Sequence, residues 1–336
     1  MKTTKLGILG LGRIGRIHLE NLCTKIPGVE VLAAMNPSEA GQAFARSWNV
    51  PLVTSDADTV INHPDINAIV VCSPTDSHAE YVQKAARAGK AIFCEKPLDL
   101  SLETVKQTLK VVKDAKVPLM LAFNQRLDPS FAAVKEKIND GSIGNIISVH
   151  IISRDPEPPP VHYIKSSGGL FMDMTIHDFD MSRHITGSEV TEVFAKGYNL
   201  IDPEIGKAGD IDTGFILLTF ENGVTVIIEN SRKAIYGYDQ RLEVFGTKGM
   251  VRAENPYKDT SLFFDESGGH MKRLPDFFMT RYVVSYLREM EDFIDALRNK
   301  RPMPITGEDG LKAMIIAVAA NRSVKEGRPV KITEIG

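Results

Sequence analysis

Apolar runs and amphipathic stretches alternate along the first 122 residues of the chain. The apolar runs are KLGILG, VEVLAAM, NAIVVC, AIFCE and VPLMLAF. The stretches between them have helical periodicity over residues 13–26, 38–47, 76–88 and 102–115. Runs that are apolar at every position are typical of strands covered on both faces, and strands that alternate with helices form parallel sheets. Residues 1–122 are therefore predicted to form an α/β domain with a doubly wound parallel sheet.

Beyond residue 122 the pattern changes to an alternation of apolar and polar positions, which is typical of strands with one face in the core. The alternating segments are NIISVHIIS, TEVFAKGYN, TGFILLTFENGVTVIIENS and RLEVFGTKGMVRA. In ENG and TKG, glycine is expected to supply the positive φ of a hairpin turn. Helices are expected over residues 130–140, 169–186, 280–299 and 307–326. Residues 123–336 are predicted to form an α+β domain with a large, mostly antiparallel open sheet, which binds substrate and mediates oligomerisation.

The segment RDPEPPPVHY, Arg154–Tyr163, has four prolines in five positions, which enforce an extended backbone. Such a segment can act as a stiff linker or as a docking site for a peptide. Because it lies between a predicted strand and a predicted helix inside the second domain, we expect a loop at the edge of a pocket.

Composition narrows the function classes. The formal net charge is -3 and lysine and arginine are dispersed, so the basic stripe of a nucleic-acid-binding protein is absent. The N-terminal lysines and apolar residues resemble a signal peptide, but Gly10, Gly12 and Arg13 interrupt them. The apolar run 313–320 is far shorter than the roughly 20 residues that span a bilayer. Three cysteines without C-x-x-C spacing fit a reduced, cytoplasmic compartment.

The turn GLGRIG joins the first apolar run to the first helix. GxGxxG alone is a weak signal, but this context of strand and helix is the one in which it binds a dinucleotide. Gly10 permits the tight turn, Gly12 lets backbone N–H groups approach a pyrophosphate, and Gly15 lets helix and strand pack closely. Arg13 and Ile14 lie in the same turn, and the helix N-terminus adds partial positive charge. A purely structural glycine turn is the alternative.

At the end of the second strand, about 20 residues downstream, an acidic residue usually binds the ribose 2′-hydroxyl. Asn36 stands there instead. An amide can still bond ribose hydroxyls, but it lacks the charge that repels a 2′-phosphate. Because no lysine or arginine lies between Pro37 and Ala45, we expect NAD as the cofactor, while Arg13 leaves NADP open.

Five further motifs are AIFCEKPLDLS, NQRLDP, SRDPEPPP, SGGLFMDMTIHDFDMSRHITG and YGYDQRLEVFG. Together with GLGRIG they make the chain resemble the glucose–fructose oxidoreductase and inositol dehydrogenase (Gfo/Idh/MocA) family nearly from end to end, and the inositol 2-dehydrogenases most. The resemblance implies a Rossmann domain and NAD-dependent oxidation of a secondary alcohol of a cyclic polyol, with myo-inositol and 2-keto-myo-inositol as substrate and product.

The family's catalytic residues match Lys96, Asp173 and His177. Oxidation of a secondary alcohol requires a base for the hydroxyl proton, and an imidazole is a neutral acceptor near physiological pH. If residues 169–186 form one helix, Asp173 lies one turn before His177 and can orient its ring. The Lys96 ammonium, at the carboxyl end of a parallel strand, can stabilise developing alkoxide charge. The isomer of the bond from Lys96 to Pro97 is left open.

Other residues are assigned to the cofactor or the substrate side. The expected cofactor contacts outside the glycine turn are Asn36, Ser73, Thr75, His78, Glu95 and Lys96, of which Thr75 and His78 are implied by the resemblance, because in the family this loop flanks the cofactor. Ser77 and Glu80 offer an alternative for this loop, a capping box at a helix N-terminus. The expected substrate contacts are Lys96, Arg126, Arg154, Asp155, Asp173, His177, Tyr236 and Tyr238. Each tyrosine has packing as its alternative.

A metal site is conceivable from Asp180 and His184, which share a helix face with His177. The resemblance implies a family that works without metal, so none is expected. A cofactor-binding regulator without chemistry and an NAD-using glycosidase are the competing functions. Partners are expected to be a small cyclic polyol and further copies of the chain in a homotetramer or dimer, with no nucleic acid and no membrane. Which inositol isomer or sugar is used is left open.

Overall fold

The computed structural model describes residues 3–335, and the chain forms two compact units. Of the described residues, the first unit contains 3–124 and 284–312, and the second contains 125–283 and 313–335. Segment 284–312 thus folds with the N-terminal residues although it follows the second unit's sheet in the sequence. The assignment of cofactor binding and substrate binding to separate domains remains a proposal.

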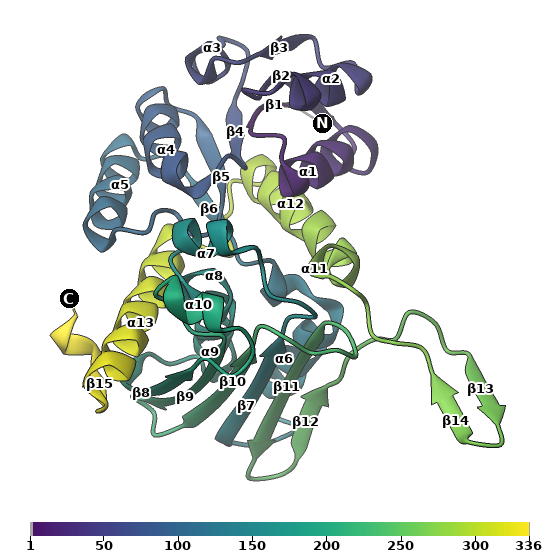
Figure 1. The fold of residues 1–336 in the computed structure, drawn as a ribbon. Helices are drawn as coiled ribbons and strands as arrows, with labels where there is room; N and C mark the ends of the chain where they lie inside the picture. The colour runs from purple at the N-terminus through teal and green to yellow at the C-terminus, as the bar shows by residue number, and fades with distance from the viewer. Residues whose placement is uncertain (1–2, 336) are drawn as a thin grey trace. The chain divides into compact units, whose positions relative to one another are not determined.

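The first unit is built on a six-stranded parallel sheet with the order β3-β2-β1-β4-β5-β6 (Figure 1). Its strands are β1 (Thr4–Leu9), β2 (Val29–Met35), β3 (Leu52–Thr54), β4 (Ala68–Val71), β5 (Ala91–Glu95) and β6 (Leu119–Ala122). The connecting helices are α1 (Arg13–Thr24), α2 (Glu39–Ser47), α3 (Ala57–Ile61), η1 (Thr75–Ser77), α4 (His78–Arg87) and α5 (Leu102–Ala115). The predicted doubly wound sheet is confirmed, and its strand order reverses between β1 and β4, where such folds bind ligands.

Helices cover both faces of this sheet, which explains its continuously apolar strands. All four residues of β4 are completely buried. Helix α12 (Val283–Arg298), from the late segment, adds Met290 and Phe293 to the core, and both are completely buried. The Arg298 guanidinium at its end donates to the carbonyl oxygen of Pro27 at 2.8 Å. These contacts fix the late segment in the first unit.

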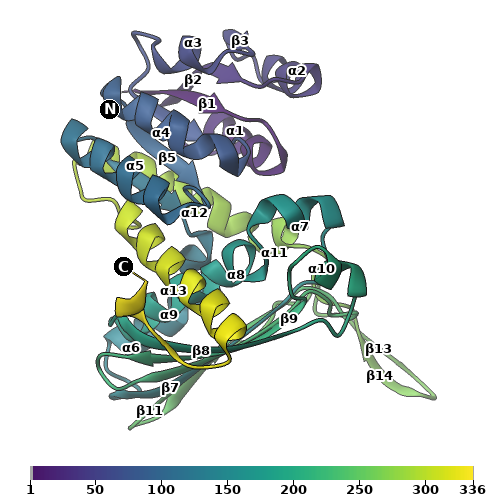
Figure 2. The same cartoon turned by 60° about the vertical axis from the view of Figure 1, so that its left-hand side comes forward.

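The second unit contains a seven-stranded sheet with the order β12-β11-β7-β10-β9-β8-β15. Its strands are β7 (Ile146–Arg154), β8 (Val190–Tyr198), β9 (Thr213–Phe220), β10 (Thr225–Ser231), β11 (Asp239–Gly246), β12 (Met250–Ala253) and β15 (Val330–Lys331). Only β7 and β10, among the described pairs of this sheet, run parallel, so the predicted, mostly antiparallel sheet is confirmed. Figure 2 shows α8 (Leu170–Asp173), α9 (Thr175–Thr186) and α13 (Gly307–Glu326) along one side of it.

The remaining elements of the chain are short or lie at the margins of the sheets. They are η2 (Asn124–Leu127), α6 (Pro129–Asn139), α7 (Val161–Ser167), α10 (Pro203–Lys207), the hairpin β13 (Leu262–Asp265) and β14 (Gly268–Met271), α11 (Phe278–Arg281) and η3 (Ile332–Glu334). Both ribbon views show the β13–β14 hairpin projecting away from the seven-stranded sheet (Figures 1 and 2).

Several local predictions were wrong. The helix expected over 169–186 is interrupted at Met174, where φ is −99° and ψ is −59°, so α8 and α9 are separate helices. The helix expected over 280–299 is likewise divided into α11 and α12 at Tyr282. Gly223 of ENG has the expected positive φ of 83°, but Gly249 of TKG is not among the glycines with positive φ. Within the described residues, no helix has the length and apolar character needed to traverse a membrane.

Candidate active site

The three glycines of the turn between β1 and α1 have three different environments. Gly10 has a φ of +92°, and a Cβ atom there would lie 2.5 Å from the backbone nitrogen of Ser73. A Cβ atom on Gly15 would lie 2.0 Å from the carbonyl oxygen of Gly10. At Gly12, in contrast, such a Cβ would meet no heavy atom of the described residues within 4 Å, apart from its chain neighbours and the backbone of its own helix. These environments match the predicted tight turn, close packing and open approach.

The N-terminus of α1 fits a pyrophosphate. Its N-cap is Gly12, no side chain caps it, and its first turn has no acidic residue. The backbone N–H groups of a helix's first turn lack partners within the helix and carry partial positive charge. Arg13 is exposed and Ile14 is half-buried in that turn. An anionic group can therefore approach the backbone over Gly12, although contact with a dinucleotide stays a prediction.

Asn36, which directly follows β2, supports this turn through a side-chain hydrogen bond. Its side-chain Oδ1 accepts the N–H of Leu11 at 2.8 Å, and its Nδ2 donates to the Ser38 hydroxyl, also at 2.8 Å. A Cβ atom on Gly41 would lie 2.1 Å from Nδ2, so the glycine makes room for the amide. The amide is 8% exposed and committed to the fold. Its role in holding the turn is therefore visible, whereas a bond to ribose is a prediction.

The loop after β4 contains Ser73, Thr75 and His78. The alternative of a capping box from Ser77 is wrong, because its side chain makes no cap. The Ser77 hydroxyl donates to the Pro74 carbonyl at 2.7 Å and lies 2.7 Å from the Ser73 hydroxyl, with which it shares a hydrogen bond. His78 is 2% exposed, with Nε2 2.7 Å from the Ser73 carbonyl oxygen and Nδ1 2.8 Å from that of Pro97. This placement favours a structural role in which His78 links the two loops.

The EKP segment follows β5. Glu95 points to the buried imidazole of His18, whose Nε2 lies 2.8 Å from Glu95 Oε1. Lys96 is half-buried, and its bond to Pro97 is cis. The Glu289 carboxylate of α12 lies 3.5 Å from His18 Nε2 and is completely buried. Burial, and then the neighbouring Glu95, raises the pKa of Glu289 well above its ordinary value.

Nitrogen, sulfur and oxygen atoms of His18, Cys72 and Glu95 lie within 4.8 Å of one another. The hydrogen bond from His18 to Glu95 accounts for two of these groups. Burial raises the pKa of the Cys72 thiol well above its ordinary value, which disfavours the thiolate that metals bind. The cluster therefore fits a buried hydrogen-bond network better than a metal site.

In the second unit, Asp173 lies at the end of α8 with both carboxylate oxygens occupied. Oδ1 accepts the Tyr163 hydroxyl at 2.9 Å, and Oδ2 accepts Nη1 of Arg232 at 3.0 Å. His177 is half-buried in the first turn of α9, beyond the break at Met174. The single helix assumed for the aspartate and histidine is therefore wrong, and their positions depend on two short helices instead.

Arg126 and Asp180 form an ion pair that bears on two of the predicted sites. The guanidinium Nε and Nη2 lie 2.7 and 2.5 Å from the two carboxylate oxygens of Asp180, whose side chain is 1% exposed. This two-pronged geometry is typical of strong arginine–carboxylate pairs. The Asp180 carboxylate, which a metal site with His184 would need, is therefore already bound to Arg126. If Arg126 contacts a substrate, it does so while paired with Asp180.

A second network surrounds Arg154 at the end of β7. Its guanidinium donates to Glu229, to the Tyr236 hydroxyl at 2.6 Å and to Asp239 at 3.2 Å. Tyr236 is 43% exposed, and its hydroxyl also donates to Asp239. Tyr238 is buried instead, with its ring edge against a neighbouring tyrosine. Tyr236 remains a candidate for contact with a polyol, whereas the burial of Tyr238 favours its packing alternative.

Asp155 follows β7 at the start of the proline-rich loop. Its backbone N–H donates to the Ser231 carbonyl at 2.9 Å, and its carboxylate lies 3.8 Å from Nη1 of Arg232. The prolines lead into α7, which carries Tyr163 and so reaches Asp173. The loop is therefore tied to the candidate site, and its position at the edge of a pocket stays a prediction.

Sequence reasoning missed the groups that support the candidate residues. In the second unit they are Tyr163, Arg232 and Asp210, and in the first unit they are His18 and Glu289. Tyr163 lies in the proline-rich motif, which offered a signal. Arg232 had none, because an isolated arginine after a strand usually lies at the surface.

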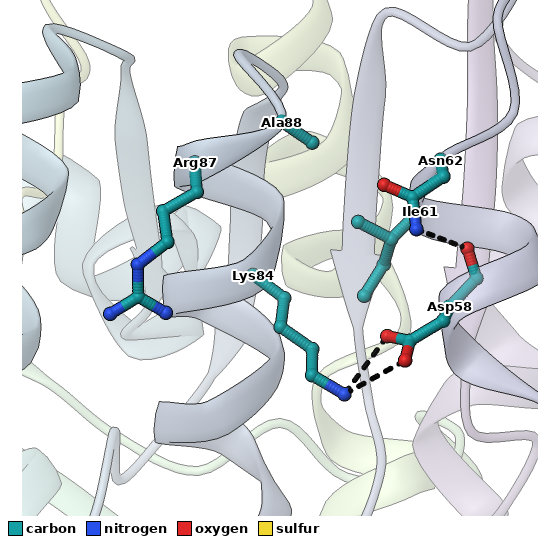
Figure 3. Close-up of a pocket in the computed structure, with 6 residues that line it drawn as sticks. All are labelled: Asp58, Ile61, Asn62, Lys84, Arg87 and Ala88. Carbon is teal, nitrogen blue, oxygen red and sulfur yellow. Dashed lines mark hydrogen bonds and ion pairs between the residues drawn. The ribbon is translucent and has the colours of Figure 1, made fainter.

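A shallow pocket between α3 and α4 lies elsewhere in the first unit (Figure 3). Its lining includes Asp58, whose carboxylate pairs with the Lys84 ammonium at 2.9 Å. These helix ends lead into the amino ends of β4 and β5, whereas the glycine turn lies at the carboxyl ends of the strands. The pocket is therefore not part of the candidate site.

Two family models match the chain. The one described as an oxidoreductase family with an NAD-binding Rossmann fold matches residues 4–123. The GFO/IDH/MocA C-terminal domain matches residues 131–252. Each of the two units thus contains a matched segment.

Known proteins resemble the chain over nearly its full length. Myo-inositol 2-dehydrogenase of Thermotoga maritima is 44% identical over 333 residues, which are 98% of this chain and 99% of that protein. Inositol 2-dehydrogenase of Rhizobium meliloti is 47% identical over 331 residues, with the same coverage. The crystal structure of scyllo-inositol dehydrogenase from Lactobacillus casei, with bound NAD(H) and scyllo-inositol, is 34% identical with a TM-score of 0.92, covering 99% of this chain and 100% of that one.

Proposed function

Since this chain belongs to the GFO/IDH/MocA oxidoreductase family, we propose that it oxidises myo-inositol to 2-keto-myo-inositol with NAD. The observation that carries this proposal is the likeness to two inositol 2-dehydrogenases at 44% and 47% identity over 98% of the chain. The chain is an NAD-binding oxidoreductase that acts on a CH–OH group, and the inositol is the substrate that its relatives favour.

The residues of the first unit fit a dinucleotide. The open approach over Gly12 and the uncapped N-terminus of α1 suit a pyrophosphate, and the loop with Ser73 and Thr75 follows β4, beside the point where the strand order reverses. When bound, NAD supplies the nicotinamide that accepts hydride from the alcohol carbon. Asn36 holds the turn that receives it.

Three residues are proposed to carry the chemistry. The His177 imidazole takes the hydroxyl proton, so that the oxygen can form a carbonyl as the carbon loses its hydrogen. The Asp173 carboxylate accepts a hydrogen bond and orients its donor. The Lys96 ammonium stabilises the negative charge that develops on the oxygen. Arg154, Tyr236 and Asp155 offer donors and acceptors for the other hydroxyls.

The test is oxidation of a panel of inositols and sugars with NAD, followed by the absorbance of reduced nicotinamide. We expect turnover of myo-inositol, and a loss of at least about 100-fold in kcat for His177→Ala. His270→Ala, an exposed histidine of the β13–β14 hairpin in the same unit, is the control and should keep wild-type turnover. Absence of oxidation across the panel would favour the regulator, and wild-type turnover by His177→Ala would remove the assigned base.

A homotetramer or dimer is proposed from the outer face of the seven-stranded sheet. Large apolar side chains are 40–48% exposed on neighbouring strands of this sheet, namely Ile147, Phe215, Leu217, Ile227 and Phe245. Ile227 and Leu217 are directly paired. Such a patch on one face is typical of an interface between subunits. Light scattering of Leu217→Glu should show a smaller species, whereas Leu200→Glu, in a loop, should not change the assembly.

A cytoplasmic location is proposed as well. All three cysteines of the chain are free thiols, and Cys72 and Cys94 are buried. Unpaired cysteines suit a reducing compartment. Fractionation of cells that express the chain should recover it with cytoplasmic markers, and recovery from an oxidising compartment would contradict this location.

A further inference from the structure

Arg232 is the largest fully buried side chain of the described residues and forms an ion pair with the candidate aspartate, Asp173. It follows β10 and is 1% exposed. Its Nη1 lies 3.0 Å from Asp173 Oδ2 and 3.8 Å from Asp155 Oδ2, and its Nη2 lies 3.7 Å from Asp210 Oδ2. Three carboxylates thus surround one guanidinium, and all four groups belong to the second unit.

A buried charge is costly unless carboxylates compensate it, and removal of one partner leaves the other unpaired. Burial lowers the pKa of Arg232, but Asp173, Asp155 and Asp210 together raise it above its ordinary value. The guanidinium is therefore a fixed positive charge beside Asp173. Its presence stabilises the ionised form of that carboxylate over the protonated form.

The guanidinium is linked to both ends of α8, directly through Asp173 and indirectly through Asp210. Asp173 is the last residue of this helix, and Asp210 accepts the N–H of its first residue, Leu170, at 3.0 Å. A Cβ atom on Gly169 would lie 2.7 Å from Asp210 Oδ1, so the glycine lets the carboxylate reach the helix. The backbone N–H of Arg232 donates to the Asp212 carbonyl at 2.8 Å, which fixes the arginine itself. Helix α8 is only four residues long and depends on such contacts for its position.

We propose that Arg232 is a positioning residue that keeps the Asp173 carboxylate ionised and fixes its orientation. Asp173 then serves only as a hydrogen-bond acceptor, and His177 alone takes the proton. This inference rests on the proposed function for the roles of Asp173 and His177. Asp173 Oδ1 accepts the Tyr163 hydroxyl and Oδ2 accepts Arg232 Nη1, and a carboxylate oxygen can accept more than one hydrogen bond.

The test compares Arg232→Met and Arg232→Lys with Arg281→Met. Arg281 is a matched control because it is 8% exposed and pairs with Asp128, so that its removal also leaves a buried carboxylate without its arginine partner. Melting curves measure the folded fraction, and kcat, KM and the pH profile of kcat/KM are measured with myo-inositol and NAD. We expect Arg232→Met to lower kcat about 100-fold, because a small displacement of a catalytic group has this effect.

The pH profile separates positioning from a structural role. In Arg232→Met the acid side of the kcat/KM profile should move to higher pH by about one unit, because the loss of the positive charge favours the protonated forms of Asp173 and His177, and both groups must be unprotonated for turnover. Arg232→Lys should restore at least about tenfold of the lost kcat, a difference of 1.4 kcal/mol. Arg281→Met should lose stability and keep the wild-type profile. A wild-type profile in Arg232→Met, or losses equal to those of Arg281→Met, would overturn the proposal.

Failure of the proposed function can be distinguished from failure of the proposed role of Arg232. If the wild-type protein oxidises no polyol, the function fails, and carboxyl NMR of the protein labelled with ¹³C at aspartate Cγ decides the positioning. Asp173→Asn assigns the resonance of Asp173. A titration of that resonance that shifts to higher pH in Arg232→Met supports the contact, and an unchanged titration overturns it.

Discussion

The side-chain Oδ1 of Asn36 accepts the backbone N–H of Leu11 at 2.8 Å, which ties the end of β2 to the middle of the glycine turn. Asn36, which replaces the usual acidic residue, therefore stabilises the glycine turn directly. An aspartate would keep this acceptor and could accept from the Ser38 hydroxyl in place of the present donation from Nδ2. The substitution adds a charge with little rearrangement, so it isolates the electrostatic effect on cofactor choice.

Asn36→Asp should lower the use of NADP relative to NAD. A carboxylate at this position repels a 2′-phosphate but accepts the 2′-hydroxyl of NAD. We expect the ratio of kcat/KM for NAD over NADP to rise at least about tenfold, a difference of 1.4 kcal/mol. Asn67→Asp adds the same charge at an exposed site before β4 and should leave the ratio unchanged. An unchanged ratio in Asn36→Asp would show that another group selects the cofactor.

Gly12→Ala and Gly15→Ala should separate cofactor binding from folding. A Cβ on Gly12 meets no described atom and its φ of −71° suits alanine, so the stability loss should stay below about 1 kcal/mol. A methyl group there blocks the approach to a pyrophosphate, and calorimetry should show at least about tenfold weaker NAD binding. In Gly15→Ala the clash with the Gly10 carbonyl should destabilise the protein by about 1–3 kcal/mol in urea. Wild-type NAD affinity in Gly12→Ala would contradict the assigned pyrophosphate site.

Asp178→Asn should stabilise the protein at neutral and higher pH. Burial raises the pKa of Asp178 to about 7, although hydrogen bonds from Ser153 and Asn230 oppose the shift. Because the pKa of Asp178 is higher in the folded than in the unfolded protein, the protonated carboxyl contributes fully to the free energy of unfolding below pH ~4. This contribution is lost as the pH rises through 7. The asparagine should match the wild type near pH 4 and exceed it by roughly 2–4 kcal/mol at pH 8.

Urea unfolding at several pH values checks this expectation. Asp114→Asn, an exposed aspartate on α5, is the control and should show no such pH dependence. A variant of Asp178 that is less stable than the wild type at pH 8 would mean that the ionised carboxylate stabilises the fold.

Local sequence patterns predicted the two sheets, because a strand buried on both faces is apolar at every position, whereas a strand buried on one face alternates apolar and polar residues. The glycine turn was predictable for the same reason, since Gly10 and Gly15 are required by contacts within a few elements of the chain. The break at Met174 was not predictable, because it depends on Asp210 and Arg232, which bind the two ends of α8 from distant segments. Tertiary contacts of this kind leave no periodic trace in a sequence.

The return of segment 284–312 to the first unit was hidden as well, because an amphipathic helix does not indicate which core it covers. His18 illustrates the same limit. Its partners are Glu95, from a motif, and Glu289, from a helix almost 200 residues further along the chain. A functional motif can thus be recognised while the groups that hold it cannot.

Glu289→Gln should stabilise the protein increasingly as the pH rises. Burial raises the pKa of Glu289 well above its ordinary value, and Glu95 adds to the shift, so the folded protein favours the protonated carboxyl. A group with a raised folded pKa contributes most below its unfolded pKa and loses that contribution as the pH rises. Glutamine mimics the protonated form at every pH, so the stability difference from the wild type should grow between pH 5 and pH 9.

The control for this prediction is Glu291→Gln, an exposed glutamate on the same helix, which should show a constant difference from the wild type. The opposite outcome has a definite meaning. His18 Nε2 lies 3.5 Å from Glu289 Oε1, and an ion pair between a protonated imidazole and an ionised carboxylate would be lost in the variant. A Glu289→Gln protein that is less stable than the wild type at neutral pH would therefore show that the buried pair is charged. Urea midpoints measured across this pH range decide between the two states.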